Sequence, residues 1–218
     1  WEDQKYQLLK NVSANKQITV LQRDAVDSFY YDAWFPPRKQ LFENVTSKVK
    51  CDWKHIENNF LDFNWQYLIP HQQSTRGPKM AVADVNGDGL DDFYICGARL
   101  QPGALMLQQP GEIFISSDTA LFAKDLMYED VDALFFDTNG DGYPDLYVAS
   151  GGNELYGNDN FLPDRIYMND GKGNFSKSSQ LLPPIFQNKS CVSVSDIDKD
   201  GDKDIFVGVL ADAKAYGI

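Results

Sequence analysis

The chain has 218 residues, enough to bury a sizeable core in one large domain or two smaller ones. Apolar residues make up 43% of the sequence and aromatic residues 13%, which excludes a disordered chain. The formal net charge of −12 argues against binding to nucleic acid or anionic membranes, and no apolar run approaches the roughly 20 residues that span a bilayer.

The chain is expected to begin with a short β segment over residues 1–37. Two consecutive prolines, Pro36 and Pro37, mark its end, because proline lacks a backbone N–H and interrupts regular structure. Residues 38–218 follow as a region of internal repeats. We therefore predict two parts, an N-terminal segment and a larger repeat region.

An acidic motif occurs three times in the repeat region. Residues 84–92 read DVNGDGLDD, residues 137–145 read DTNGDGYPD and residues 196–204 read DIDKDGDKD. Each copy has Asp at position 1, Asp or Asn at position 3, Asp at position 5, Gly at position 6 and Asp at position 9. A solvated acidic loop requires neither this spacing nor a fixed glycine. The repetition therefore favours a common binding role.

The spacing suits a hard cation. Ca²⁺ takes oxygen ligands from carboxylates, amides, backbone carbonyls and water, whereas Mg²⁺ demands a stricter octahedron and keeps its water. Side chains at positions 1, 3, 5 and 9 and the carbonyl at position 7 would surround the ion, and glycine at position 6 permits the sharp turn. No Cys or His enters the motif, which argues against zinc. The predicted ligands of up to three Ca²⁺ ions are Asp84, Asn86, Asp88, Leu90 and Asp92; Asp137, Asn139, Asp141, Tyr143 and Asp145; and Asp196, Asp198, Asp200, Asp202 and Asp204.

The three loops are expected to differ in affinity. Asn86 and Asn139 keep a side-chain oxygen but lack the charge of Asp198, so the first two loops should bind Ca²⁺ more weakly than the third. Three bound ions would change the formal net charge from −12 to about −6, because each carries two positive charges. Much of the acidity is therefore local to the loops.

The motif is not an EF-hand. An EF-hand closes with Glu at position 12, where this chain has Ile95, Val148 and Val207. The residues after each loop, FYICGA, LYVASGG and IFVGVL, are rich in β-branched and aromatic residues and read as strands. The loops are therefore expected to join strands.

Each repeat is expected to contain four strands. The first reads MAVADV, DFYICGA, GALMLQQ and EIFISS, and the second reads ALFFD, DLYVAS, RIYMND and a short strand from Phe175. Four strands in about 50 residues are typical of a propeller blade. The predicted fold is all-β, with β-propeller-type four-stranded blades and calcium-binding inter-strand loops. The blades are expected at about 78–125 and 131–178, with a partial third at about 190–218.

Two to three blades cannot close a ring, which needs about four. We therefore expect a partial propeller with an open blade edge, and self-association through that edge is one consequence.

The pattern resembles the FG-GAP/VCBS repeat family, which includes the propeller blades of integrin α-subunits. It is most similar to bacterial secreted proteins that combine these repeats with an ASPIC/UnbV module. Residues 55–98, 129–154 and 164–175 carry the resemblance to the blades, and WEDQKYQLLKNVSANKQITV resembles the tail of an ASPIC/UnbV module. The resemblance implies a propeller-type fold, calcium and a secreted or cell-surface setting, with the bacterial outer surface favoured. It implies no known enzymatic reaction.

Several residues outside the motif are further candidate site residues. His55 and His71 lie near Glu57, Asp62 and Arg76 in sequence, but ordinary hydrogen-bonded or exposed histidines are favoured over a catalytic pair. The insertion from Ser150 to Asp164 either holds a ligand or only decorates the surface. Free, buried thiols are favoured over a disulfide for the three cysteines, Cys51, Cys96 and Cys191.

The expected function is that of a calcium-binding extracellular module that binds a protein or glycan ligand in adhesion. The alternative is a calcium-dependent hydrolase or other enzyme acting on extracellular polysaccharide. The sequence assigns no catalytic residue, and the G-x-S-x-G nucleophile motif is absent. The binding role is favoured.

Overall fold

The computed structural model describes residues 3–35, 40–178 and 182–210. The chain divides into two compact units, Trp1–Val45 and Thr46–Ile218, and each is described by itself. The expected break at Pro36–Pro37 and the end of the expected third blade, 211–218, lie outside the described residues.

The first unit contains little regular structure. Its two strands pair antiparallel, and it also holds a 3-10 helix and a single-turn α-helix: β1 (Lys5–Tyr6), β2 (Asp27–Ser28), the 3-10 helix Gln22–Asp24 and α1 (Tyr31–Trp34). Ala25 is the one buried residue among those whose burial is described here. The unit is therefore held mainly by the short ladder and aromatic contacts such as that of Tyr6 with Phe29.

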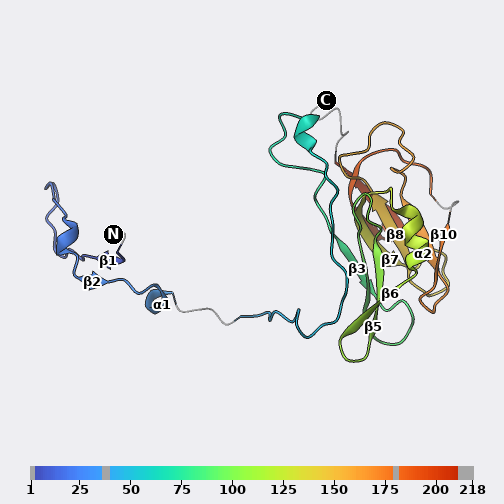
Figure 1. The fold of residues 1–218 in the computed structure, drawn as a ribbon, viewed down its shortest axis with the longest axis horizontal. Coiled ribbons are helices and arrows are strands. Elements are labelled where there is room, and N and C mark those ends of the chain that lie inside the picture. The colour runs from blue at the N-terminus through green and yellow to red at the C-terminus, as the bar shows by residue number, and fades with distance from the viewer. Residues whose placement is uncertain (1–2, 36–39, 179–181, 211–218) are drawn as a thin grey trace. The chain divides into compact units, whose positions relative to one another are not determined.

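The second unit contains two four-stranded antiparallel sheets and a hairpin (Figure 1). The first sheet follows chain order and consists of β3 (Met80–Ala83), β4 (Asp92–Ile95), β5 (Ala104–Gln109) and β6 (Ile113–Ser117). The second does likewise and consists of β7 (Asp130–Phe136), β8 (Asp145–Ser150), β9 (Arg165–Asn169) and β10 (Phe175–Ser178). The hairpin pairs β11 (Lys189–Ser195) with β12 (Asp204–Val209).

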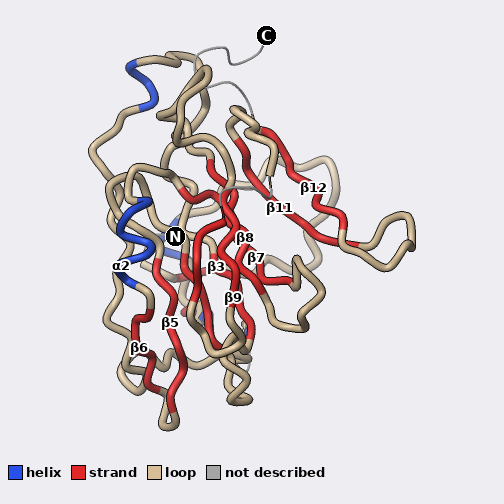
Figure 2. The backbone as a smooth tube through the Cα atoms, turned by 90° about the vertical axis from the view of Figure 1, so that its right-hand side faces the viewer, coloured by secondary structure: helices blue, strands red, loops and turns tan. Residues whose placement is uncertain are grey.

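The sheets are arranged like neighbouring blades. The first strand of each sheet lies beside that of the next, because β7 contacts both β3 and β11. The loop that joins β11 to β12 projects away from the two sheets in Figure 2. The all-β, four-stranded blade-like architecture predicted from the sequence is thus confirmed, and the described residues form no closed barrel.

A short helical connection between the sheets completes the core. It comprises α2 (Thr119–Phe122) and the 3-10 helix Ala123–Asp125, which the sequence analysis did not predict. Phe122 is buried, and its ring centroid lies 5.2 Å from that of Tyr94 and 5.1 Å from that of Tyr167. One aromatic side chain thereby joins the apolar faces of the two sheets.

Buried polar contacts also join the sheets. Asp130 of β7 accepts hydrogen bonds from the Tyr94 hydroxyl (2.8 Å) and the Gly97 N–H (3.1 Å), and it forms an ion pair with Arg165 of β9. The carboxylate, the guanidinium and the phenol are all almost completely buried. A buried charge is tolerated only when it is paired in this way, so Asp130 fixes the contact between the sheets.

The cysteines are free, as predicted, but their burial differs from the prediction. Cys96 is buried, Cys51 is half-buried and Cys191 is exposed. Cys191 lies on the exposed face of β11, where exposed residues alternate with half-buried ones such as Ser190 and Val192. None of the helices described is long and apolar enough to cross a membrane.

Candidate metal centre

The three acidic loops occupy the same place in each sheet. Residues 84–91, 137–144 and 196–203 each connect the first strand of a sheet to the second. Position 6 has a positive backbone φ in every loop: 84° at Gly89, 88° at Gly142 and 102° at Gly201. This backbone region favours glycine, so the fixed glycine follows from the turn. The loops join strands and not helices, as predicted.

The first aspartate organises the backbone of its own loop. Asp84 accepts hydrogen bonds from the N–H groups of Gly87 and Gly89, both at 2.8 Å. Asp137 does the same with Gly140 (2.7 Å) and Gly142 (2.8 Å). Desolvation opposes ionisation of Asp84, but these N–H groups lower its pKa overall. Both carboxylates are therefore held in the charged form.

Asparagine at position 3 is hydrogen-bonded within the first two loops. Asn86 donates its side-chain N–H to Asp88 Oδ2 (3.1 Å) and accepts the Asp88 N–H (3.0 Å). Asn139 and Asp141 repeat this exchange at 2.8 and 2.9 Å. The amide thus occupies one carboxylate oxygen of position 5. An aspartate at position 3 cannot donate in this way.

Positions 5 and 7 are also linked in every loop. The backbone N–H of Leu90 donates to Asp88 (2.8 Å) and that of Tyr143 to Asp141 (2.9 Å). In the third loop the Asp202 N–H donates to Asp200 at 3.1 Å. The N–H of position 7 is therefore used, and the carbonyl oxygen is the backbone group that all three loops can offer a cation at this position.

The last aspartate fastens the first two loops to their sheets. Asp92 is completely buried and accepts the N–H groups of Val85 (3.1 Å) and Gln108 (2.7 Å) with its two oxygens. Burial raises the pKa of Asp92, although these two N–H groups partly offset the effect. A carboxylate oxygen has more than one lone pair, so the bonds do not prevent metal ligation. They do give position 9 a structural task that the motif did not reveal.

Asp145 has the same task in the second loop. Its Oδ2 accepts the Thr138 N–H (3.1 Å) and the Thr138 hydroxyl, and its Oδ1 accepts the Asn169 N–H (2.8 Å). The Asn169 side chain in turn donates to the carbonyls of Val85 (2.8 Å) and Pro144 (3.1 Å). Asn169 therefore ties the first loop to the second. The motif does not identify Asn169, because this residue lies on the third strand of the second sheet, outside the motif.

The third loop gathers carboxylates. Asp196, Asp198 and Asp204 each offer an oxygen, and these three atoms lie within 4.8 Å of one another. No other group of three such residues is this close in the part of the chain that the structure describes. Like charges at this separation repel strongly, and a cation would neutralise them.

One oxygen in the third loop has no partner. Asp196 Oδ2 accepts the Gly201 N–H (3.2 Å), but Asp196 Oδ1 is buried and makes no hydrogen bond. A buried acceptor without a donor costs free energy, which a bound cation would recover. The chemistry of the loop, with carboxylates and an unpartnered oxygen, fits a hard cation such as Ca²⁺.

A cleft of about 500 Å³ separates the second and third loops. It is lined by Asp137, Thr138 and Asn139 on one side and by Gly201, Asp202 and Lys203 on the other. A ligand in this cleft would touch two of the predicted metal sites at once.

The histidines form ordinary polar contacts. His55 Nε2 lies 2.7 Å from Glu57 Oε1, and His71 Nε2 lies 3.1 Å from the Gln73 amide. Asp62 is completely buried and accepts the N–H and hydroxyl of Ser74 at 3.1 and 2.7 Å. Arg76 is exposed. These residues do not come together as one catalytic group.

The insertion after β8 packs against the segment that precedes β3. Asn153 donates to Asp62 and to Gln66 (2.9 Å), and Glu154 accepts from Asn58 (2.8 Å) and Arg99 (3.3 Å). The insertion is thus anchored at its first residues. Its contacts are structural.

A buried acid lies beside this insertion. Glu129 is 4% exposed and accepts the Arg99 N–H at 2.6 Å. Burial raises the pKa of Glu129 to about 9, with the nearby charges of Glu57 and Glu154 acting in the same direction. Glu129 is therefore protonated at neutral pH.

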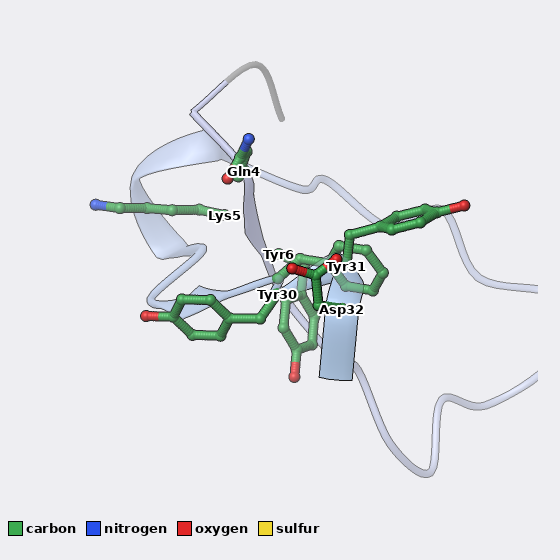
Figure 3. Close-up of a pocket in the computed structure, with 7 residues that line it drawn as sticks. Gln4, Lys5, Tyr6, Tyr30, Tyr31 and Asp32 are labelled. Carbon is green, nitrogen blue, oxygen red and sulfur yellow. The ribbon is translucent and has the colours of Figure 1, made fainter. Parts of the chain in front are cut away.

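The first unit has a hollow of about 630 Å³, which is lined by four aromatic residues and by Gln4, Lys5 and Asp32 (Figure 3). The Tyr30 and Tyr31 rings point in opposite directions, so they do not form one flat platform for a ligand (Figure 3). The acidic loops, with convergent charges and a common geometry, are the stronger candidate site.

Comparison with known proteins agrees with the repeat pattern. No curated protein matches the chain. Residues 137–207 match the FG-GAP-like repeat family model. The matched range begins at the first residue of the second loop and includes the whole of the third, together with β8 to β11 and most of β12. The chain therefore carries an FG-GAP-like repeat over residues 137–207.

Proposed function

We propose that this chain is a calcium-binding β-propeller-type repeat module of a secreted or cell-surface protein, and that it binds a protein or glycan ligand in adhesion. The observation that carries the proposal is the third loop, where Asp196, Asp198 and Asp204 converge around an oxygen without a partner. The first two loops also lie between the first and second strands of their sheets. Because their positions are equivalent to that of the third loop, the proposal includes all three sites.

The residues that would hold the ions are the motif side chains at positions 1, 3, 5 and 9 and the position 7 carbonyl. Bound Ca²⁺ would supply positive charge and link these oxygens, and thereby stiffen each loop. The chain's own contribution is a prearranged turn, because Asp84 and Asp137 already bind the loop amides. Stiff loops on a rigid sheet are suited to presenting a binding surface.

The setting follows from the expected affinity. Extracellular calcium modules have Kd values of roughly 10⁻⁴–10⁻³ M, which resting cytosol leaves empty. Asn86 and Asn139 reduce the charge of two loops and fit this weak regime. The proposed location is the cell exterior, with the bacterial outer surface favoured. The finer proposal, that residues 1–37 are the tail of an ASPIC/UnbV module, rests on the sequence resemblance.

A thermal melt tests the calcium sites. The chain is stripped with EDTA and melted without metal, with Ca²⁺ and with Mg²⁺. Each site filled at ten times its Kd adds about 1.4 kcal/mol of stability. One such site should raise Tm by roughly 3–6 °C with Ca²⁺ and less with Mg²⁺.

Matched variants show whether the loops are responsible. Asp196→Asn removes a predicted ligand and should reduce the Ca²⁺-dependent rise. Asp91→Asn removes an exposed carboxylate that lies within the first loop but outside the ligand set, and should leave the rise unchanged. Equal Ca²⁺ and Mg²⁺ effects, or equal effects of the two variants, would contradict the proposal.

A second candidate function is hydrolysis of extracellular polysaccharide, and the observation that favours it is the protonated Glu129 near Glu57 and Glu154. A protonated carboxyl can act as a general acid. However, only 4% of Glu129 is exposed, so a polysaccharide has little access to it. Binding is therefore favoured over hydrolysis.

Glu129→Gln separates the two functions. The native carboxyl keeps its proton up to pH 9, whereas the unfolded one loses it near pH 4.5, so the native state binds more protons between these values. Stability should therefore fall as pH rises through that window, with a slope of up to about 1.4 kcal/mol per pH unit, and Glu129→Gln should remove this slope.

The same variant tests hydrolysis directly. If the wild type hydrolyses a polysaccharide and Glu129→Gln does not, the chain is an enzyme and the binding role is not its main function.

A further inference from the structure

A small cavity lies beside the starts of β3 and β11, at the ends of these strands that are opposite the acidic loops. Its volume is about 120 Å³, and Gln73, Arg76, Lys79, Asn188 and Ser190 are among the residues that line it. Lys79 directly precedes β3, and Asn188 directly precedes β11. The acidic loops follow the other ends of these same strands, so the cavity and the predicted calcium sites are separate.

Two buried amides in this cavity have unpartnered atoms. Asn188 is 4% exposed, and neither its side-chain oxygen nor its side-chain nitrogen makes a hydrogen bond. Gln73 is 7% exposed, and its side-chain oxygen also has no partner. Each buried polar group left unpaired costs about 1–3 kcal/mol, and such groups are uncommon in folded proteins. Two of them in one cavity indicate a missing polar ligand.

The cavity is also positively charged, in a chain whose formal net charge is −12. Arg76 is exposed at the cavity and makes no ion pair with any described carboxylate. Lys79 Nζ lies 3.1 Å from Asp132 Oδ2 and 3.1 Å from the Ser190 carbonyl, and its side chain is 43% exposed. Lys189 is not available to a ligand here, because its ammonium group is paired with Asp164 (3.2 Å) and donates to the Leu162 and Ile185 carbonyls. Arg76 is thus the cation available to a ligand.

The polar groups specify the ligand chemistry. A carboxylate suits the Arg76 guanidinium and the Asn188 N–H, since both donate hydrogen bonds. The oxygens of Asn188 and Gln73 are acceptors and require a ligand that donates. Sulfate offers only acceptors and would leave these oxygens unpaired. A hydroxyl group next to a carboxylate satisfies both kinds of partner.

We propose that this cavity binds the carboxylate and adjacent hydroxyl of a hydroxycarboxylic acid. Two sources offer a carboxylate with a nearby hydroxyl: a free small hydroxy acid, and the terminal uronic acid of a glycan, in which the hydroxyl is one carbon farther from the carboxylate. The inference deepens the proposed binding function and rests on it, because it names the ligand class. The site itself uses none of the calcium-loop residues.

The test is an NMR titration of the ¹⁵N-labelled, Ca²⁺-saturated chain. Glycerate, glucuronate and a short oligouronide are added in separate experiments. The Asn188 side-chain N–H₂ signal and the Gly152 backbone signal should shift with all three, because both residues line the cavity. Glucose, which has hydroxyls but no carboxylate, should cause no shift. Glycerate binding without oligouronide binding would assign the site to free hydroxy acids, and tighter oligouronide binding would assign it to glycans.

Variants make the result specific. Arg76→Ala changes an exposed side chain, so the chain should fold, and its affinity for glucuronate should fall about tenfold. Arg23→Ala, which removes an exposed arginine from the other unit, is the matched control and should have no effect. Asn188→Asp preserves the shape of the side chain but adds a negative charge, and it should abolish binding.

The outcomes also separate this proposal from the calcium sites. The Ca²⁺-dependent rise in Tm should be the same in Arg76→Ala as in the wild type. A Ca²⁺ response without any shift at Asn188 would overturn the hydroxycarboxylate site alone. Equal shifts with glucose or phosphate would also overturn the hydroxycarboxylate site. Absence of a Ca²⁺-dependent rise in Tm in the wild type would instead contradict the proposed calcium-binding function.

Discussion

The second and third acidic loops carry the same motif but use its last aspartate differently. Asp145 is completely buried, and its two oxygens accept the N–H groups of Thr138 and Asn169. Asp204 is partly exposed and accepts the N–H of Ile197 (2.8 Å), while one of its oxygens lies in the carboxylate cluster of the third loop.

The difference comes from the neighbouring strand. Asn169 lies on β9, the third strand of its sheet, whereas the described part of the β11–β12 sheet has two strands. Without a third strand, Asp204 receives no second backbone N–H from within the described residues. The motif determines which oxygens are present, and the surrounding sheet determines which of them are already hydrogen-bonded.

The largest expected effect is on Asp145. Asp145→Asn replaces one of the two acceptor oxygens by an N–H₂ group that faces a donor, and it removes the negative charge that strengthens the remaining hydrogen bonds. The loss of stability should be about 3 kcal/mol. Asp204→Asn, measured in the same EDTA-containing buffer, should cost less than about 1 kcal/mol, because the change also relieves repulsion in the cluster. Urea unfolding measures both values, and equal costs would refute the distinction drawn between the loops.

An exchange at position 3 should come next in size. Asp198→Asn gives the third loop the residue of the first two, and should weaken its Ca²⁺ binding about tenfold through loss of one ligand charge. Asn139→Asp is the reverse change and should strengthen the second loop, because it adds charge and removes the N–H that occupies Asp141. The NMR signals of Gly142 and Gly201 report the two loops separately during a Ca²⁺ titration. An unchanged affinity in both variants would mean that position 3 is not a ligand.

Much of the fold could be predicted because its signals are local. The strand after each loop is a run of β-branched and aromatic residues, and the glycine at position 6 is required by its positive φ. The spacing of the motif also predicted that the loops occupy equivalent places, between the first and second strands. Periodicity and turn chemistry act over a few residues, so the sequence alone reveals them.

The rest depends on contacts between distant residues. Asn169 bonds to the Val85 carbonyl 84 residues away, and nothing around position 169 indicates that partner. Asn188 and Gln73 likewise share a cavity although they lie far apart in sequence. The helix α2 went unpredicted because its four residues are too few for a helical period to show. Burial and unpartnered atoms emerge only when such segments are packed.

The smallest expected effect concerns position 4 of the motif. The first two loops have glycine there, with φ of 75° at Gly87 and 78° at Gly140, whereas the third has Lys199 at 64°. A side chain in this left-handed region is strained by about 1 kcal/mol, and replacing it by glycine relieves that strain. Glycine also has more conformational freedom in the unfolded chain, which offsets part of the stability gained. Lys199→Gly should therefore stabilise the metal-free chain by about 0.5 kcal/mol.

Charge must be separated from strain in this experiment, because Lys199 also carries a positive charge next in sequence to Asp198 of the carboxylate cluster. Lys199→Gln removes the charge and keeps the strained backbone, so it is the matched control. In EDTA, Lys199→Gly should be more stable than Lys199→Gln, and both should bind Ca²⁺ more tightly than the wild type since the competing cation is gone. If the two variants are equally stable, the turn of the third loop tolerates a side chain at position 4, and the glycines of the first two loops are not required by the backbone.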